Sequence, residues 1–377
     1  MRTRAAVLHE MSLPRPYAES RPLRIEEITL DPPGEGEVLL RMRAAGLCHS
    51  DLSVINGNRP RPMPMALGHE GAGEVVEVGQ GVADLKPGDH VVAAFVPCCG
   101  ACEPCREGRP ALCEPGLRAN TAGVLLGGAR RLHATAGERG DIHHHLGVSA
   151  FAEYATLSRH SVVKVDDDLP FDEAAVFGCA VMTGVGAVLN TAKPRPGASM
   201  AIVGLGGVGL AALLGARVAE AETIVACDLS DEKLALAREL GATHTINVAE
   251  EGAAERIRTL TGGGVRYAFE MAGSVKAMEL AYRVTRRGGV TVTAGLSHPQ
   301  AMFSIPHVGI VAEERTIQGS YLGSCDPARD IPQYVALYRA GRLPVHRLLS
   351  EHLALDDING AFDRLADGKS VRQIVTL

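Results

Sequence analysis

The chain has 377 residues, of which 46% are hydrophobic and 22% charged, and its formal net charge is −6 at pH 7. This length allows two domains of ordinary size, each with a core of its own. The negative balance gives no general attraction to phosphate backbones or anionic lipid, so we expect no nucleic-acid partner and no membrane association. The first ten residues lack the continuous apolar segment of a secretory signal, and a cytoplasmic location is predicted.

Up to about residue 180, short alternating segments such as 37–43 and 73–78 are separated by Gly and Pro turns, which predicts a mostly β domain. Residues 114–147 are expected to form a long, irregular connection, and loops of this length are usually functional or mobile. This connection contains His143, His144 and His145. We interpret the three histidines as a solvated run rather than a third metal site.

From residue 199 to residue 322, strands alternate with amphipathic helices, which predicts a parallel α/β sheet. The strands are expected at residues 200–203, 223–227, 267–270, 289–294 and 316–319, with a helix after Gly209 and another over residues 231–240. Residues 196–216 carry no charge and have the length of a membrane span, but their six glycines favour a buried strand, turn and helix. The segment after residue 323, with a last strand at 373–377, is expected to rejoin the first domain.

Six of the nine cysteines fall into two sets with the spacing of metal ligands, which argues against a framework of disulfide bonds. The first set is spaced C-x2-C-x2-C-x7-C and consists of Cys99, Cys102, Cys105 and Cys113. Four thiolates leave no open coordination position, so this set predicts a structural zinc site, with a reactive redox cluster as the alternative. The remaining cysteines, Cys98, Cys227 and Cys325, are expected to be free thiols, although Cys98 could compete as a ligand.

The second set is Cys48, His69 and Cys179, which provides three protein ligands and leaves a fourth position for water or substrate. Two thiolates and a neutral imidazole would leave a bound Zn²⁺ as a Lewis acid that lowers the pKa of an alcohol toward neutrality. Glu70 is a candidate for a supporting residue or a transient zinc ligand. Asp51 is placed to hold the ligand imidazole by its free N–H group.

A glycine-rich turn follows the strand at residues 200–203 and opens a helix, as in dinucleotide-binding folds. It reads Gly204-Leu205-Gly206-Gly207-Val208-Gly209. Asp228 ends the next strand, where its carboxylate can accept hydrogen bonds from both ribose hydroxyls of an adenosine and would repel a 2'-phosphate. The sequence therefore predicts NAD rather than NADP, with Lys233 as a further ribose contact. A glycine turn without a nucleotide is the alternative.

Three segments resemble zinc-containing medium-chain alcohol dehydrogenases. They are Gly68-His69-Glu70-x2-Gly73-x5-Gly79-x2-Val82, Ala45-Gly-Leu-Cys48-His-Ser50-Asp51 and Gly178-Cys179-Ala-Val-Met-Thr183-Gly-Val-Gly. The resemblance covers essentially the whole chain. It implies an α/β protein with a GroES-like, β-rich catalytic domain over residues 1–180, completed by residues 323–377. Residues 181–322 would form the second domain, a Rossmann coenzyme domain with a doubly wound parallel sheet.

The same resemblance implies roles for single residues. A hydroxyl at Ser50 would take the proton from the alcohol, whereas Ser53 stands where the family has a relay histidine, so that water or His49 would complete the relay. His49 also stands where many members place an arginine on the coenzyme pyrophosphate, and an imidazole holds a phosphate less firmly. Further family positions are Arg372 for the pyrophosphate, Thr183 for the nicotinamide face, and Phe95 and Leu296 for the substrate pocket. The family also places the residues after His145 at the cleft, which would let His145 reach a substrate.

Together these features predict a zinc enzyme with one catalytic and one structural Zn²⁺ per chain, which oxidises a primary or aryl alcohol reversibly and transfers hydride to NAD. The alternatives are a thiol-adduct (formaldehyde-type) or polyol dehydrogenase, and a nucleotide-binding protein without turnover. The full-length connection at residues 114–147 favours the family's homodimer over its tetramer.

Overall fold

The computed structural model describes residues 1–135 and 140–377, and the chain divides into two compact units. The first unit comprises Met1–Cys179, Asp326–Pro332 and Leu349–Leu377, and the second comprises Ala180–Cys325 and Gln333–Leu348. The sequence prediction placed all of residues 323–377 in the first domain, whereas Gln333–Leu348 belongs to the second unit. This stretch begins within helix α12 (Pro327–Arg339), whose amphipathic pattern does not reveal the unit on which it packs.

Two β-sheets form the frame of the first unit. One is a closed barrel of β1 (Arg2–Leu8), β2 (Leu23–Leu30), β7 (Leu132–Ala134), β8 (Asp141–His144) and β4 (Met65–Ala66). The other has the order β10 (Val162–Val165), β6 (His90–Ala93), β5 (Gly71–Val78), β3 (Glu37–Gly46), β18 (Gln373–Thr376) and β17 (Glu351–Ala354), with β9 (Tyr154–Ser158) also on β3. Strand β18 pairs antiparallel with β3, so the end of the chain completes this sheet as predicted.

Short helices connect these strands. They are α1 (Tyr17–Ser20), α2 (His49–Ile55), α3 (Glu103–Arg106), α4 (Glu114–Ala122), α5 (Phe171–Ala175) and α13 (Ile358–Ala366). The prediction of an irregular connection over residues 114–147 is wrong, because α4, β7 and β8 lie within it. Cys113 caps α4 by accepting the Gly116 N–H, and β7 and β8 are fixed by pairing with strands distant in sequence, which a local pattern does not show. Residues 136–139 of the connection lie outside the described residues.

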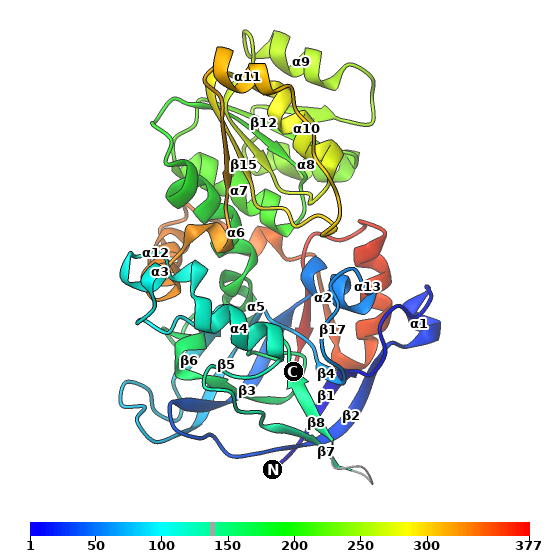
Figure 1. Cartoon of the computed structure of the whole chain (residues 1–377), viewed down its shortest axis with the longest axis vertical. Helices are drawn as coiled ribbons and strands as arrows, with labels where there is room; N and C mark the ends of the chain where they lie inside the picture. The colour runs from blue at the N-terminus through cyan, green and yellow to red at the C-terminus, as the bar shows by residue number, and fades with distance from the viewer. Residues whose placement is uncertain (136–139) are drawn as a thin grey trace. The chain divides into compact units, whose positions relative to one another are not determined.

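The second unit contains a parallel sheet, as the alternating pattern predicts. Its order is β13 (His244–Asn247), β12 (Thr223–Asp228), β11 (Ser199–Val203), β14 (Val265–Glu270), β15 (Thr285–Thr293) and β16 (Thr316–Gly319). The helices of this unit are α6 (Ala180–Gly186), the π-helix Ala187–Ala192, α7 (Gly207–Val218), α8 (Asp231–Glu239), α9 (Ala253–Leu260), α10 (Val275–Val284) and α11 (His307–Ala312). Figure 1 shows α7, α8 and α10 beside the strands of this sheet.

The central strands β11 and β12 are buried on both faces, which is the usual reason why parallel strands read as continuous hydrophobic runs. Ala201, Val203 and Val225 are among the fully or almost fully buried members of the core. Two helices start at serine caps: Ser230 accepts the Lys233 N–H at α8, and Ser274 accepts the Ala277 N–H at α10. The uncharged stretch at residues 196–216 forms β11, the glycine turn and most of α7, as predicted.

Among the described residues, no single helix has the length and apolar composition needed to cross a membrane. One bent pair of helices, Phe171–Gly178 and Ala180–Ala192, meets those criteria by length and composition only.

Candidate zinc centres and coenzyme turn

Cys48, His69 and Cys179 come together within the first unit. Cys48 precedes α2, His69 lies between β4 and β5, and Cys179 follows the 3-10 helix Val176–Gly178. Their ligand atoms, together with a carboxylate oxygen of Glu70, all lie within 4.8 Å of one another, and all four residues are buried. The distance from Cys179 Sγ to His69 Nε2 is 3.6 Å. Two ligands on a tetrahedral zinc, at about 2.3 Å for sulfur and about 2.0 Å for nitrogen, would be about 3.5 Å apart, so the site fits the ion.

The backbone next to these ligands is packed too closely for side chains other than glycine. Gly68 has φ +92°, and a Cβ atom there would lie 2.4 Å from the Phe151 backbone nitrogen. Gly178 precedes Cys179, and a Cβ atom there would lie 2.0 Å from the Ala93 carbonyl oxygen. Both glycines are therefore needed to bring the ligand segments against the strands that position them.

Asp51 holds the imidazole of His69, as predicted. Its Oδ1 lies 3.0 Å from His69 Nδ1 and accepts the Gly68 N–H at 3.2 Å, while Oδ2 accepts the Cys48 N–H at 3.2 Å. Burial opposes protonation of His69, but the Asp51 carboxylate outweighs burial and raises the His69 pKa well above its ordinary value. With Nδ1 directed at Asp51, the Nε2 atom of His69 faces the thiols and is available to a metal.

The thiols of Cys48 and Cys179 interact, and this interaction favours the thiolate form that binds zinc. A hydrogen bond from Cys179 lowers the pKa of Cys48 well below that of an ordinary thiol. Thiolate is the form that binds zinc, so the pair is one proton away from a complete ligand set.

Glu70 is fully buried, and Arg372 pairs with it. Arg372 Nη1 lies 3.1 Å from Glu70 Oε2 and donates to the Leu47 carbonyl oxygen at 2.6 Å. Burial raises the pKa of Glu70 to about 8 against the opposing charge of Arg372. Among the described residues, Glu70 Oε1 has no hydrogen-bond partner, which leaves it available to a cation in the cluster. The buried pair is an observation that the sequence did not suggest, because the two residues lie 302 positions apart.

The four-cysteine set also comes together, with its sulfur atoms within 4.8 Å of one another. Backbone N–H groups point at two of the thiols: Cys102 N lies 3.3 Å from Cys99 Sγ, and Cys99 N lies 3.2 Å from Cys113 Sγ. Such bonds stabilise thiolate charge, as a zinc site made of four cysteines requires. Cys98 is directed elsewhere, toward the carbonyl oxygens of Val96 and Pro110.

The prediction of a solvated histidine run is wrong for two of its three members. His144 is buried, accepts the Arg131 N–H at 3.1 Å, and has its pKa lowered to about 3 by burial. His145 is also buried, and its Nδ1 lies 3.2 Å from Asp51 Oδ1. His144 lies on the inward face of β8 with Ile142, and His145 lies in the turn that follows the strand; a sequence read as a loop shows neither position.

The glycine turn lies between β11 and α7 in the second unit, with Gly206 as the helix cap. A Cβ atom at Gly209 would lie 1.8 Å from the Gly204 carbonyl oxygen, so the turn cannot close with a larger residue. A Cβ atom at Gly206 would meet nothing within 4 Å, so space remains above the helix start. Free N–H groups at the start of a helix of 12 residues fit a pyrophosphate.

The other predicted coenzyme and proton-transfer residues are found on both units. Asp228 ends β12, and its Oδ2 accepts the Leu205 N–H of the glycine turn at 2.6 Å, so carboxylate and turn are adjacent. Lys233 lies on α8 and Thr183 is buried on α6. His49 and Ser50 occupy the first turn of α2, where the Ser53 hydroxyl donates to the His49 carbonyl oxygen at 2.8 Å.

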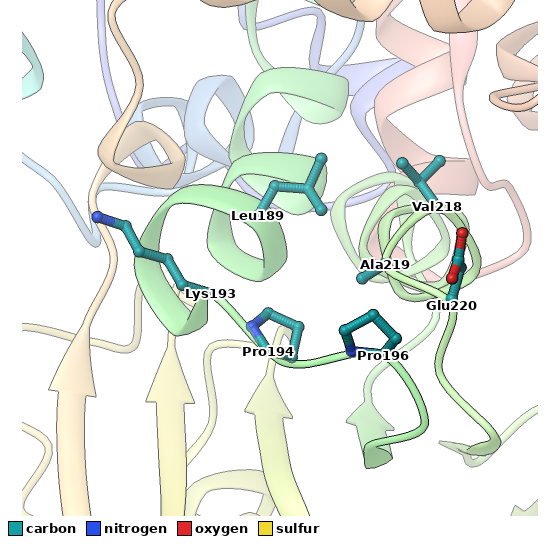
Figure 2. A pocket seen from close by; sticks show the side chains of 7 residues that line it. All are labelled: Leu189, Lys193, Pro194, Pro196, Val218, Ala219 and Glu220. Atoms are coloured by element: carbon teal, nitrogen blue, oxygen red, sulfur yellow. The ribbon is translucent and has the colours of Figure 1, made fainter.

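A separate pocket in the second unit is shown in Figure 2, and it lies between the end of the π-helix and the end of α7. Its lining residues are Leu189, Lys193, Pro194, Pro196, Val218, Ala219 and Glu220. None of them belongs to the metal clusters or the glycine turn, so this pocket does not bear on the chemistry of those sites.

A unit with a zinc-ligand set of Cys, His and Cys and a unit with a nucleotide-binding turn define a metal-dependent dehydrogenase. Residues 34–167 match the alcohol dehydrogenase GroES-like domain, and residues 207–340 match the zinc-binding dehydrogenase domain. The chain is 38% identical to S-(hydroxymethyl)glutathione dehydrogenase of Paracoccus denitrificans, with 100% of both sequences covered. It is also 38% identical to NDMA-dependent alcohol dehydrogenase of Amycolatopsis methanolica, over 100% of this chain and 99% of that one.

Among solved structures, benzyl alcohol dehydrogenase from Acinetobacter calcoaceticus matches with a TM-score of 0.92 and 31% identity, over 100% of this chain and 99% of that one. The chain belongs to the zinc-containing alcohol dehydrogenases of the medium-chain dehydrogenase/reductase family. This confirms the predicted fold class, the two zinc sites and the assignment as an NAD-dependent oxidoreductase acting on CH–OH groups.

Proposed function

We propose that the enzyme oxidises a primary or aryl alcohol to its aldehyde, and reduces the aldehyde in the reverse direction. The observation that supports this proposal is an aromatic side chain packed against His69, one of the predicted zinc ligands. Phe95 is buried and packs edge-on against the His69 ring, with the ring centroids 5.5 Å apart. An aromatic wall beside the metal favours an apolar or aromatic substituent on the carbon that is oxidised.

Bound zinc supplies Lewis acidity to an alcohol, and NAD supplies the acceptor for the hydride. Cys48, His69 and Cys179 would hold the metal, and Asp51 fixes the imidazole in the tautomer that presents Nε2. The Ser50 hydroxyl would accept the proton of the alcohol and pass it toward solvent. The Ser53 hydroxyl is engaged with the His49 carbonyl oxygen, so the chain beyond Ser50 would continue through water or the His49 ring.

For the coenzyme, we propose that the pyrophosphate binds at Gly204, Gly206, Gly207, Val208 and Gly209, at the start of α7. Asp228 would accept the ribose hydroxyls, and Lys233 would add a contact to the ribose. Thr183 would pack on the nicotinamide ring, and His49 and Arg372 would contact the pyrophosphate. Arg372 would have to do so while keeping Glu70 and the Leu47 carbonyl as its partners.

The substrate class is tested by a screen of NADH formation over benzyl alcohol, ethanol, a longer primary alcohol, sorbitol and S-(hydroxymethyl)glutathione. We expect the highest kcat/KM with the benzylic or longer primary alcohol. F95A should lower the preference for benzyl alcohol over ethanol, because it removes the aromatic wall but no metal ligand. A preference that F95A leaves unchanged would contradict the proposal.

A thiol-adduct dehydrogenase is the second candidate, supported by the relative from Paracoccus denitrificans that carries this activity in its name. The segment after the Cys48 ligand contains Arg59 and Arg61 and no acidic residue between positions 55 and 61. Arg61 is half-buried, and its Nε has no partner among the described residues. Two cations favour a substrate that carries a carboxylate, and the glutathione adduct in the screen decides between the candidates.

We also propose that the enzyme is a homodimer formed by the second unit. Strand β16 lies at the edge of its sheet, where β15 is its one partner among the described strands, and all four of its residues are exposed. Val308 and Val311 on the neighbouring α11 are 71% and 69% exposed, and Met302 is 83% exposed. An open edge next to an apolar surface is suited to pairing with a second copy.

The dimer is tested by measuring the mass in solution with light scattering. V308E/V311E should give the mass of one chain, whereas the wild type gives that of two. An unchanged mass in the variant would contradict the surface proposed here.

For location, we propose the reducing cytoplasm. All nine cysteines are free thiols, and both zinc sites need their cysteines reduced.

A further inference from the structure

The buried carboxylate of Asp51 faces two imidazoles rather than one. Its Oδ1 lies 3.0 Å from His69 Nδ1 and 3.2 Å from His145 Nδ1. The relative exposure of the Asp51, His69 and His145 side chains is 0%, 1% and 2%. His145 Nδ1 makes no hydrogen bond among the described residues, so it faces Oδ1 through a close electrostatic contact, whereas His69 Nδ1 is hydrogen-bonded to the same oxygen.

An ionised carboxylate only accepts hydrogen bonds, so both imidazoles must present N–H groups to Asp51. A His145 with a proton on Nδ1 meets this requirement. Asp51 therefore receives hydrogen bonds from His69, Gly68 and Cys48 and faces the Nδ1 edge of His145 at 3.2 Å, and these contacts together hold a buried charge in one position.

His145 also packs directly on the metal ligand. Its ring meets the His69 ring edge-on, with centroids 5.4 Å apart and an interplanar angle of 89°. Phe95 meets the His69 ring at 5.5 Å and 88°. The two aromatic contacts and Asp51 together restrict the rotation of the His69 ring.

Hydrogen bonds and an unusual backbone conformation fix the turn that carries His145. The backbone N–H of His145 lies 3.0 Å from Ser149 Oγ, and that hydroxyl donates to the Ala66 carbonyl oxygen at 2.8 Å. Leu146 and Ser149 have positive φ values of 52° and 53°. A non-glycine residue in this conformation costs on the order of 1 kcal/mol or more and persists where the surroundings require it.

We propose that His145 is a positioning residue of the catalytic zinc site, acting through Asp51. By placing its Nδ1 edge 3.2 Å from Oδ1, it holds the carboxylate at the point from which Asp51 orients His69. His145 does not touch the metal in this proposal, which depends on the zinc site and not on the identity of the alcohol.

The test compares three forms of the zinc-loaded enzyme: wild type, H145F and H145N. Phenylalanine keeps a ring but has no donor, whereas the asparagine amide can place its N–H near the position of Nδ1. Zinc release to an excess of chelator is followed with a colorimetric zinc indicator, and the zinc of the four-cysteine site is the internal control. The same proteins with Co²⁺ in the catalytic site report ligand geometry through their absorption bands.

We expect H145F to lose catalytic zinc on the order of tenfold faster than the wild type, and its Co²⁺ bands to shift. H145N should restore the band positions and release zinc at close to the wild-type rate, and release from the four-cysteine site should be equal in all three forms. Unchanged release and bands in H145F would overturn the proposal. An equally fast release of catalytic zinc from H145F and H145N would also overturn the proposal, because it would show that only ring packing matters. If H145F does not fold, H145M provides the same comparison without a donor.

Discussion

The buried pair of Arg372 and Glu70 leads to a prediction about stability and its dependence on pH. The exposure of the two side chains is 4% and 0%, and their closest atoms are 3.1 Å apart. Removing one member of a buried pair costs about 3–5 kcal/mol, because the other is left without a counter-charge. For a unit of roughly 200 residues, each kcal/mol lowers the melting temperature by about 2–4 °C. R372M should therefore lower it by about 6–20 °C where Glu70 is ionised.

The size of this loss depends on pH because Glu70 can escape its charge by binding a proton. Burial raises the pKa of Glu70 to about 8, and the Arg372 charge opposes that shift, so R372M raises this pKa further. A carboxyl group whose folded pKa is raised contributes stability below its unfolded pKa of about 4.5 and loses it as pH rises through the folded pKa. The deficit of R372M relative to the wild type should therefore be larger at pH 9 than at pH 6.

The measurement is the apparent melting temperature of the metal-free protein by differential scanning fluorimetry at pH 6 and pH 9. The double variant E70Q/R372M carries neither charge, so its deficit should not grow with pH. R364M is a matched control, because Arg364 and Glu351 form a half-exposed pair at 3.0 Å in the same unit. Such a pair contributes about 0–1 kcal/mol. A deficit for R372M no larger than that of R364M, or one that falls between pH 6 and pH 9, would refute the reasoning.

Four further predictions concern separate sites. C105S should reduce zinc, measured by atomic emission, from two ions per chain to one while Cys48, His69 and Cys179 keep theirs; retention of two would contradict the assignment of the four-cysteine site. Burial depresses the pKa of His144 to about 3, so stability is lost as pH falls below about 6.5. The wild type should lose about 2 kcal/mol more than H144Q between pH 7.5 and pH 5, seen as an extra fall in melting temperature of about 4–8 °C, and parallel curves would exclude this. D228N should reduce the preference for NAD over NADP in kcat/KM by about tenfold or more, whereas an unchanged ratio would remove Asp228 from coenzyme selection. H49R should slow NADH release in stopped-flow experiments, since a guanidinium holds a pyrophosphate more firmly than an imidazole, and equal rates would show that His49 does not contact it.

The features that could be predicted from the sequence are those in which the chemistry fixes the spacing. A zinc ion requires ligands within a few ångströms, so Cys99, Cys102, Cys105 and Cys113 identify their site without knowledge of the fold. The glycine turn is similar, because the clash of a Cβ atom at Gly209 with Gly204 is a local constraint. Strand β16 was predicted with its observed bounds, since the pattern of a short strand after a helix is also local.

The features that were missed depend on contacts between segments distant in sequence. Strands β7 and β8 are short, and they form by pairing with β2 and β4 rather than through their own sequence pattern. From the sequence alone, their residues were therefore interpreted as a loop. His144 was expected in solvent for the same reason, since only the barrel determines which side of β8 faces inward, and His145 lies in the turn after that strand. No pattern in the last ten residues indicates that the side chain of Arg372 is buried against Glu70.

The zinc ligands of the catalytic site and the residues that surround Asp51 therefore differ in how freely they can be substituted. Cys48, His69 and Cys179 are fixed by the metal, whatever surrounds them. Asp51 needs donors, but a buried carboxylate accepts them from any N–H or O–H group that reaches it. In this chain the imidazole at position 145 faces that carboxylate at 3.2 Å, and it is held by a turn with two positive φ values rather than by the metal. If the properties of the zinc depend on that imidazole, a substitution at His145 changes the metal site while every ligand stays in place.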